Sequence, residues 1–262
     1  MFIVVGKQKV SKKFSIITSC YNSAPFLSTY FKSIIDQKYR PLELVFVNDH
    51  STDDFSRVIK KYISRLQKNK IEVKYIFNEH RRYCGSSYAK AINAASGDFF
   101  GVLDSDDTLT NNAVSYIMLL YKKFTETSWI YSQFRINDQK MKPRKRGFCI
   151  APPKGKTLLW LGKNGKHGFS HWRTFSRRVP NYLSVFPEKR KSAIDKYMGY
   201  KLEELAPGMF VNKILYEYRQ RTHHSISTSE RTRITWREMM IEAAERRKLH
   251  NIKVFPIKVF KD

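Results

Sequence analysis

The feature that most constrains the fold of this chain is an alternation of short apolar segments with amphipathic ones over the first 110 residues. Apolar runs at 14–18, 42–47, 71–77 and 99–103 have the length of buried strands. Between them, apolar residues recur every three to four positions, which is typical of helices that pack one face on a sheet. Strands that alternate with helices predict an α/β fold with a mainly parallel sheet flanked by helices.

Polar residues follow each of these predicted strands. They lie at 18–22, 48–51, 78–79 and 104–107. Ligands bind beyond the carboxyl ends of the strands in such sheets, so the sequence predicts a nucleotide-sized pocket at this edge. Neither Gly-x-Gly-x-x-Gly nor a P-loop follows the first strand, which argues against a dinucleotide or P-loop site.

Asp104, Asp106 and Asp107 fall within four residues directly after the fourth apolar run. Neighbouring carboxylates repel one another and resist burial unless a cation or strong hydrogen-bond donors neutralise them. Oxygen ligands at this density suit Mg²⁺ or Mn²⁺, which proteins bind through carboxylates together with substrate phosphates. The alternative is an aspartate-rich turn that only caps the helix predicted at 111–125.

Charge and cysteine content limit the partners and the compartment. With 49 Lys and Arg against 23 Asp and Glu, the net charge is +26, which implies an anionic partner such as nucleic acid, an acidic membrane leaflet or a polyanionic substrate. No zinc-finger spacing or RNA-binding signature accompanies this charge. Three widely spaced cysteines, and the absence of a long apolar run or a secretory signal, favour a reduced cytoplasmic protein.

Three motifs in the first half resemble family 2 glycosyltransferases of the GT-A fold. They are Ser15-Ile16-Ile17-Thr18 with Tyr21-Asn22, then Val47-Asn48-Asp49-His50-Ser51-Thr52-Asp53, then Ala95-Ser96-Gly97-Asp98 with Leu103-Asp104-Ser105-Asp106-Asp107. The resemblance extends over about residues 12–228. It implies a GT-A type, Rossmann-like mixed sheet, a sugar-nucleotide donor, Mn²⁺ or Mg²⁺ as cofactor, and inversion at the anomeric carbon.

The resemblance also implies roles for single residues of the donor site. Thr18, Tyr21 and Asp49 would hold the base, and an Asp49 carboxylate that accepts from an imide N–H favours uracil and hence a UDP-sugar. Asp104 would contact the ribose or the sugar, and Asp106 of the Asp-x-Asp motif would coordinate the metal. Alternatively, Asp49 only shapes a turn and Tyr21 packs on the core. Further donor-site candidates are Asn22, Asn78, Lys90, Ser105 and His223.

One segment departs from the family pattern. Where many members have Ala-Arg-Asn-x-Gly-Ile, this chain has Ser87-Tyr88-Ala89-Lys90-Ala91-Ile92. Ala89 thus stands where the family has an asparagine, and a phosphate or sugar contact of that asparagine is not expected here. Lys90, Arg81 and Arg82 are the candidates to replace it electrostatically.

The second half carries the candidates for the chemistry. His171 lies in 168–175, which is similar to a segment of bacterial chondroitin- and heparosan-type polymerase domains where a histidine joins the metal site; a core or surface histidine is the alternative. Asp195 falls where the family places its catalytic base, which takes the proton from the attacking hydroxyl. The alternatives are that Asp195 only caps a helix or that Glu188 is the base. His223 belongs to a segment that often folds over the diphosphate in relatives.

We expect a glycosyltransferase domain at 1–228, with a nucleotide-binding half at about 12–110 and an acceptor-binding half at about 111–228, followed by a basic amphipathic helical extension at 229–262. The basic loop at 140–156 is either a solvated connector or a binding site for an anionic glycan or lipid-phosphate acceptor. The extension either contacts a membrane surface or partner, or packs on the domain.

Together these features predict an inverting, metal-dependent hexosyltransferase that moves a sugar from a UDP-sugar to a glycan, lipid-linked or other anionic acceptor in surface polysaccharide biosynthesis. It would act as a peripheral protein at the inner face of the membrane, with no specific nucleic-acid partner. A nucleic-acid-binding protein on a degenerate transferase scaffold is the alternative that the charge of +26 favours. A sugar-nucleotide nucleotidylyltransferase is less favoured, because its glycine-rich, lysine-containing loop after the first strand is absent.

Overall fold

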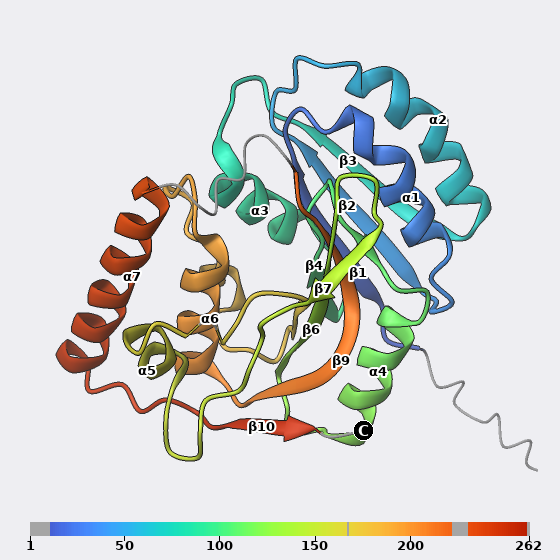
Figure 1. Ribbon diagram of the computed structural model, residues 1–262. Helices are drawn as coiled ribbons and strands as arrows, with labels where there is room; N and C mark the ends of the chain where they lie inside the picture. Colours follow the sequence, from blue (N-terminus) through green and yellow to red (C-terminus); the bar gives the residue numbers. More distant parts are fainter. Residues whose placement is uncertain (1–10, 167, 222–229, 261–262) are drawn as a thin grey trace, which may run out of the picture.

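The computed structural model describes residues 11–166, 168–221 and 230–260. One curled sheet runs through the molecule, with helices on both of its sides (Figure 1). The strand order along its main path is β10-β9-β6-β8-β4-β1-β2-β3. Most neighbouring strands are parallel and one inserted strand is antiparallel, which confirms the predicted α/β fold with a mainly parallel, mixed sheet.

The first half of the sheet is parallel and consists of the predicted strands. They are β1 (Phe14–Cys20), β2 (Leu42–Asn48), β3 (Ile71–Phe77) and β4 (Phe99–Val102). The helical segments are η1 (Ala24–Phe26), α1 (Leu27–Ile35), α2 (Phe55–Lys68) and α3 (Tyr83–Ala94). Every residue of β2 is buried, as expected for a strand that is covered on both faces. In α2, Phe55, Ile59, Tyr62 and Leu66 recur at helical spacing and form its buried face.

The second half of the sheet inserts an antiparallel strand between parallel ones. Strand β8 (Arg173–Ser176) pairs antiparallel with both β4 and β6 (Trp129–Asn137), whereas β9 (Gly208–Arg219) is parallel to β6. This insertion brings the run at 168–175 next to the end of β4. The remaining elements before the C-terminal segment are β5 (Thr108–Leu109), α4 (Ala113–Lys123), β7 (Pro143–Arg146), α5 (Leu158–Lys163), η2 (Tyr182–Val185) and α6 (Ile194–Leu205).

The C-terminal segment packs on the rest of the fold. Helix α7 (Glu230–Leu249) lies beside α5 and α6, and β10 (Ile257–Phe260) adds a parallel strand to β9 (Figure 1). Met239 and Ala243 of α7 are buried, but Ile234 and Ile241 are exposed. The apolar residues of α7 are therefore spread around the helix, and the amphipathic pattern that we expected here is weak. Within the described ranges, no helix combines the length and apolar character needed to cross a membrane.

Candidate active site

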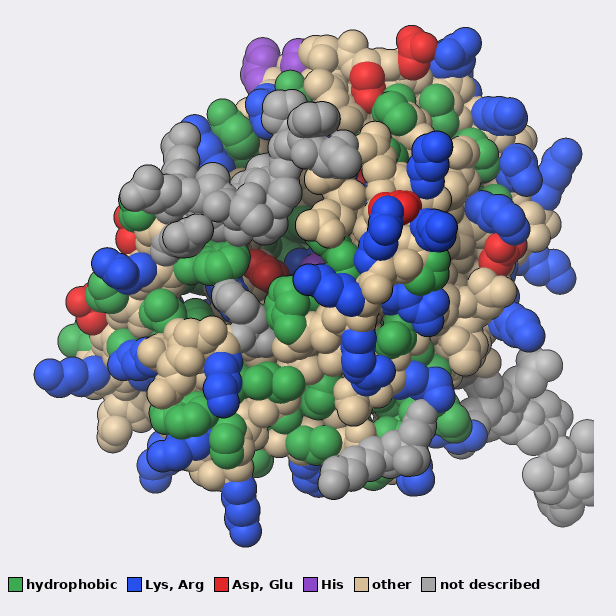
Figure 2. Space-filling view, in the orientation of Figure 1, with side chains coloured by type: hydrophobic (Ala, Val, Ile, Leu, Met, Phe, Trp, Pro, Cys, Tyr) green, Lys and Arg blue, Asp and Glu red, His purple; other side chains and the backbone are tan. Residues whose placement is uncertain are grey.

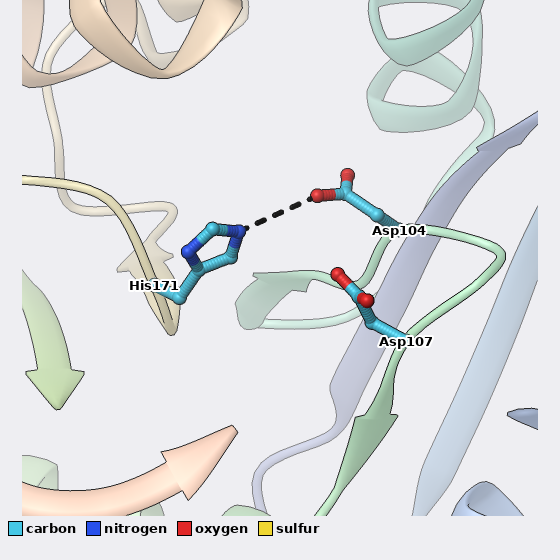
Figure 3. Close-up of side chains that lie close together, drawn as sticks. All are labelled: Asp104, Asp107 and His171. Carbon is cyan, nitrogen blue, oxygen red and sulfur yellow. Dashed lines mark ion pairs between the residues drawn. The ribbon is translucent and has the colours of Figure 1, made fainter. Parts of the chain in front are cut away.

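Asp104, two residues beyond the end of β4, lies at the centre of a group of polar side chains (Figure 3). The hydroxyl of Tyr88 on α3 donates a hydrogen bond to one carboxylate oxygen. The other oxygen lies 2.9 Å from Nη2 of Arg173 and 3.6 Å from Nε2 of His171, and 3.3 Å from the hydroxyl of Tyr216. Burial opposes ionisation of Asp104, but Arg173 and His171 outweigh it and lower the pKa of the carboxyl.

Asp107 is buried beside Asp104, and its hydrogen-bond donors among the described residues are uncharged. Its oxygens accept from the Tyr216 hydroxyl at 2.7 Å and from the backbone N–H of Arg219 at 2.7 Å. Burial, together with the negative charges of Asp106 and Asp104, raises the pKa of this carboxyl well above its usual range. The N-cap of α4 is Asn112. The aspartate-rich turn therefore does not serve as the cap of that helix.

Asp104, Asp107 and His171 each offer a ligand atom, and these atoms all lie within 4.8 Å of one another (Figure 3). The Ser170 hydroxyl lies 2.8 Å from Nδ1 of His171, which leaves Nε2 facing Asp104. Burial lowers the pKa of His171, although Asp104 and Asp195 act in the opposite direction, which favours the neutral ring that can ligate a metal. Two carboxylates and an imidazole suit Mn²⁺ or Mg²⁺ together with phosphate oxygens. This donor set fits a divalent cation, whose positive charge would favour the ionised form of Asp107.

Asp106, the metal ligand that the Asp-x-Asp motif indicates, lies outside this group of three. Its carboxylate forms an ion pair with Arg221 at 2.6 Å. Burial raises the pKa of Asp106 despite this arginine. Its assignment as the metal ligand stays a prediction, and the structure adds Asp107 as the carboxylate that faces His171. The sequence places both aspartates within four residues but gives no sign of which one points inward.

Asp49, the predicted base-binding carboxylate, holds the start of α3. It accepts hydrogen bonds from Nδ2 of Asn78 at 2.9 Å and from the backbone N–H groups of Arg82 and Tyr83, both at 2.7 Å. The turn-shaping role that we left open is therefore present in the structure. Thr18 is fully buried, where its hydroxyl is shared between the hydroxyl of Tyr30 and the carbonyl of Leu103.

The other donor-site candidates lie on neighbouring loops at the same sheet edge. The guanidinium of Arg81 lies 3.8 Å from the centre of the Tyr21 ring. Asn22 joins the loop after β1 to the loop after β2, because its side chain accepts from the backbone N–H of Thr52 at 2.8 Å. Ser105 is buried and shares a hydrogen bond with the hydroxyl of Ser23 at 2.8 Å.

Lys90 donates to the side-chain carbonyl of Asn78 at 2.8 Å. Both residues line a hollow of about 340 Å³ beside α3, which Arg82 and Glu188 also line. Glu188, the alternative base, thus faces this hollow. His223 lies outside the described residues.

Asp195 lies in the first turn of α6, whose N-cap is Ala193 and has no capping hydrogen bond from a side chain. Asp195 therefore does not cap this helix. Its negative charge raises the pKa of both His171 and Arg173, as a smaller contribution beside burial and Asp104. This electrostatic effect links Asp195 to the residues around Asp104.

Three residues at the centre were not among the candidates. Arg173 follows His171 by two positions in the segment 168–175, so the resemblance that indicated His171 could also have indicated Arg173. Tyr88 lies in the segment that departs from the family pattern, and Tyr216 lies in a strand whose neighbours only the tertiary fold determines.

The geometry agrees with comparisons to known proteins. The model of glycosyl transferase family 2 matches residues 15–182, more than half of the chain. The chain belongs to this family. Among curated glycosyltransferases, it is 27% identical over 217 residues to chondroitin synthase of Escherichia coli and 29% identical over 221 residues to hyaluronan synthase of Pasteurella multocida. Each match covers 82% of the chain but only 29% and 21% of the respective relative.

Solved structures show that this family 2 chain has the GT-A fold. S. aureus TarS in complex with UDP-GlcNAc matches with a TM-score of 0.69 and 20% identity, over 89% of this chain and 66% of that one. The mannosyltransferase PcManGT from Pyrobaculum calidifontis, in complex with GDP-Man and Mn²⁺, matches with a TM-score of 0.58 and 15% identity, over 94% of this chain and 66% of that one.

Proposed function

We propose that this family 2 chain is a hexosyltransferase that moves a sugar from a UDP-sugar to a glycan or lipid-linked acceptor in polysaccharide biosynthesis, with inversion at the anomeric carbon. The observation that carries the proposal is the group of Asp104, Asp107 and His171 at the carboxyl end of β4. Structural neighbours with this fold bind UDP and UDP-GlcNAc. Action at the inner face of the membrane is part of the same proposal and rests only on the charge of +26.

A divalent cation would be held in this site by Asp104, Asp107 and His171. When bound, such an ion supplies positive charge to the diphosphate of the donor and of the leaving nucleotide. Asp106 is the further candidate ligand, and it would have to exchange its ion pair with Arg221 for that role. Arg173 holds Asp104 ionised and in place.

Asp195 is the proposed catalytic base. Inversion by direct displacement needs one carboxylate that removes the proton from the acceptor hydroxyl as that oxygen attacks the anomeric carbon. Asp195 is half-buried at the start of α6, on the side of His171 and Arg173, and has no capping role that would occupy it. Asp49 and Tyr21 would bind the base, with Asp49 positioning the turn at Arg82 as well.

The deciding experiment is a thermal-shift screen of UDP, GDP and several UDP-sugars, each with and without Mn²⁺. A ligand that binds only the folded chain raises its melting temperature by mass action. We expect a shift with UDP ligands that requires Mn²⁺ and is absent for GDP. A folded chain that responds to no nucleotide contradicts the donor site and favours the basic binding protein.

Asp195→Asn tests the base separately from the donor site. The variant should keep the Mn²⁺-dependent shift with UDP but lose sugar transfer, because only proton removal is affected. Asp54→Asn, at an exposed ion pair beside α2, is the matched control and should transfer normally. Normal transfer by Asp195→Asn would exclude this residue as the base.

A further inference from the structure

The hairpin formed by β6 and β7 presents a row of basic side chains on the front face of the molecule. Strand β7 pairs antiparallel with β6, and all four of its residues are exposed. Within the seven residues at 140–146 the chain has five Lys and Arg side chains. Figure 2 shows such side chains gathered on this face, beside a hollow in which acidic and histidine side chains are visible.

Most of this positive charge is not neutralised by the protein. Arg144 forms an ion pair with Asp138 at 3.0 Å. Across the described ranges, the side chains of Lys140, Lys142 and Lys145 have no acidic partner. Unpaired cations in one row repel each other, and an external anion relieves this repulsion.

One end of the hairpin is fixed to the aspartates. Arg219 donates from Nη1 to the carbonyl of Gln139 at 2.6 Å and from Nε to the carbonyl of Asp106 at 2.7 Å. The same arginine gives its backbone N–H to Asp107. The hairpin turn is thus held at the side of Asp106 and Asp107.

At the other end of the hairpin, Phe148 contacts Phe134, and Phe134 contacts His171. Phe148 is 50% exposed, and its ring centre lies 5.1 Å from that of Phe134. Phe134 in turn lies 4.9 Å from the ring of His171. The Phe134 ring lies directly against the backbone of Gly147, where a Cβ atom would come within 2.5 Å of the ring. The glycine therefore leaves room for the Phe134 ring. Phe148 is therefore an exposed ring on the surface that connects to the proposed metal site.

We propose that this hairpin and Phe148 form the acceptor-binding surface, and that the acceptor is an extended glycan carrying carboxylates along its length. The inference rests on the proposed glycosyl transfer. The apolar C–H face of a sugar ring stacks on an aromatic side chain, and carboxylates form charge-assisted hydrogen bonds with Lys and Arg. Both kinds of group occur on this hairpin, which is connected to Asp106 through Arg219 and to His171 through Phe134.

The same features argue against the two other polyanions. Single-stranded nucleic acid binds to successive aromatic platforms for its bases, whereas the described part of this hairpin exposes one large aromatic ring, Phe148. A membrane surface needs a continuous apolar face beside the cations. The exposed residues of β7 are Pro143 and three basic residues, so no such face is present there.

The test is the fluorescence anisotropy of a labelled hyaluronan decasaccharide, a glycan with regularly spaced carboxylates, titrated with the chain in the absence of donor. The hairpin variant replaces three lysines by serine: Lys140, Lys142 and Lys145. The matched control removes the same charge from exposed positions of α2: Lys60, Lys61 and Lys68. We expect about tenfold weaker binding for the hairpin variant and less than about twofold for the control, because only local charges act within a Debye length.

A second pair of variants tests the aromatic contact. Phe148→Ala should weaken binding of the decasaccharide, whereas Phe255→Ala, which removes a similarly exposed ring (40% exposed) near β10, should not. The carboxyl-reduced, neutral decasaccharide should bind at least about tenfold more weakly than the acidic one.

Several outcomes would overturn the inference. The first is an equal loss of decasaccharide affinity in the hairpin and control lysine variants. The second is equal affinity for the neutral and the acidic decasaccharide. The third is a thymidine decanucleotide that binds the wild type more tightly than the decasaccharide does, and that the hairpin variant no longer binds. The thermal shift with UDP is read on the same proteins. If the wild type binds the glycan but shows no thermal shift with UDP, the proposed transfer is contradicted and the acceptor surface is not.

Discussion

Two buried or half-buried acidic clusters in this molecule differ in how their charge is balanced. The aspartate cluster consists of Asp104, Asp106 and Asp107 at the end of β4. The glutamate cluster consists of Glu203 and Glu204 near the end of α6, where α7 packs. Both remove carboxylates from water, which is unfavourable unless cations or hydrogen bonds compensate.

In the glutamate cluster the chain supplies a charged hydrogen-bond donor to both carboxylates. Glu204 accepts from Nε and Nη2 of Arg246, both at 2.8 Å, and from Nε of Arg247 at 3.0 Å. Glu203 accepts from Nη2 of Arg247 at 3.0 Å and from the backbone N–H of Leu158 at 2.7 Å. Two carboxylates thus face two guanidinium groups, and every carboxylate oxygen has a donor. These ion pairs connect α7 to α6.

In the aspartate cluster the described residues supply two cations for three carboxylates. Arg173 pairs with Asp104 and Arg221 with Asp106, whereas Asp107 accepts from a hydroxyl and a backbone N–H within the described part of the chain. The comparison teaches that buried carboxylates alone do not indicate a site. A buried carboxylate without a charged donor among the described residues is the better indicator, because a bound cation would favour its ionised form.

The largest effect that we expect from this difference is on catalysis. Asp107→Asn should lower sugar transfer by about 10⁴-fold, or about 5 kcal/mol in activation free energy, because a charged ligand is lost. The asparagine carbonyl still accepts from the N–H of Arg219, so the variant should fold and resist unfolding in EDTA as well as the wild type. Transfer assays and thermal unfolding measure both. Asp54→Asn is the control, and transfer within tenfold of wild type would contradict the assignment.

The glutamate cluster should show the opposite behaviour. Glu204→Gln leaves guanidinium groups buried without full charge compensation, and should lower the free energy of unfolding by about 4 kcal/mol. Urea unfolding measures this loss, while transfer per folded molecule should stay unchanged. Glu126→Gln, at the exposed ion pair with Lys258, should alter stability little. A Glu204→Gln variant as stable as the wild type would show that the cluster does not hold α7.

The pH dependence of stability sharpens the comparison. Burial raises the pKa of Glu203 from 4.5 to about 7 despite Arg247. The folded chain then binds the proton more tightly than the unfolded chain, so this stabilising contribution is complete below pH 4.5 and is lost as the pH rises through 7. Relative to Glu203→Gln, the wild type should lose on the order of 3 kcal/mol of unfolding free energy between pH 4.5 and 8. If the free energy of unfolding depends on pH in the same way in both proteins, the raised pKa of Glu203 is contradicted.

The smallest effects concern metal affinity. His171→Phe keeps an aromatic ring beside Phe134 and Tyr216 but removes the nitrogen ligand, and should weaken Mn²⁺ binding by about a hundredfold. Ser170→Ala removes only the hydroxyl that orients the ring, and about a tenfold loss is expected. Calorimetric titration with Mn²⁺ measures both. A larger loss for Ser170→Ala than for His171→Phe would exclude His171 as a ligand.

Much of the nucleotide-binding half could be predicted from local pattern. Strands β1 and β2 are apolar runs, and α2 repeats its buried residues at helical spacing, so each element carries its own signal. Strands β5 and β8 could not be predicted in this way. They have two and four residues, and they exist only because β9 in one case and β4 and β6 in the other offer hydrogen-bonding partners.

The amino-acid sequence alone is enough to place three aspartates after a predicted buried strand, and a histidine and an arginine within one short run. Which of the three aspartates pairs with an arginine among the described residues depends on the folded arrangement. Tyr216 reaches Asp107 across 109 residues of chain, and Arg173 reaches Asp104 across 69. Periodicity and motifs report on neighbours in the sequence, whereas the compensation of a buried charge depends on every group that the fold brings within hydrogen-bonding distance.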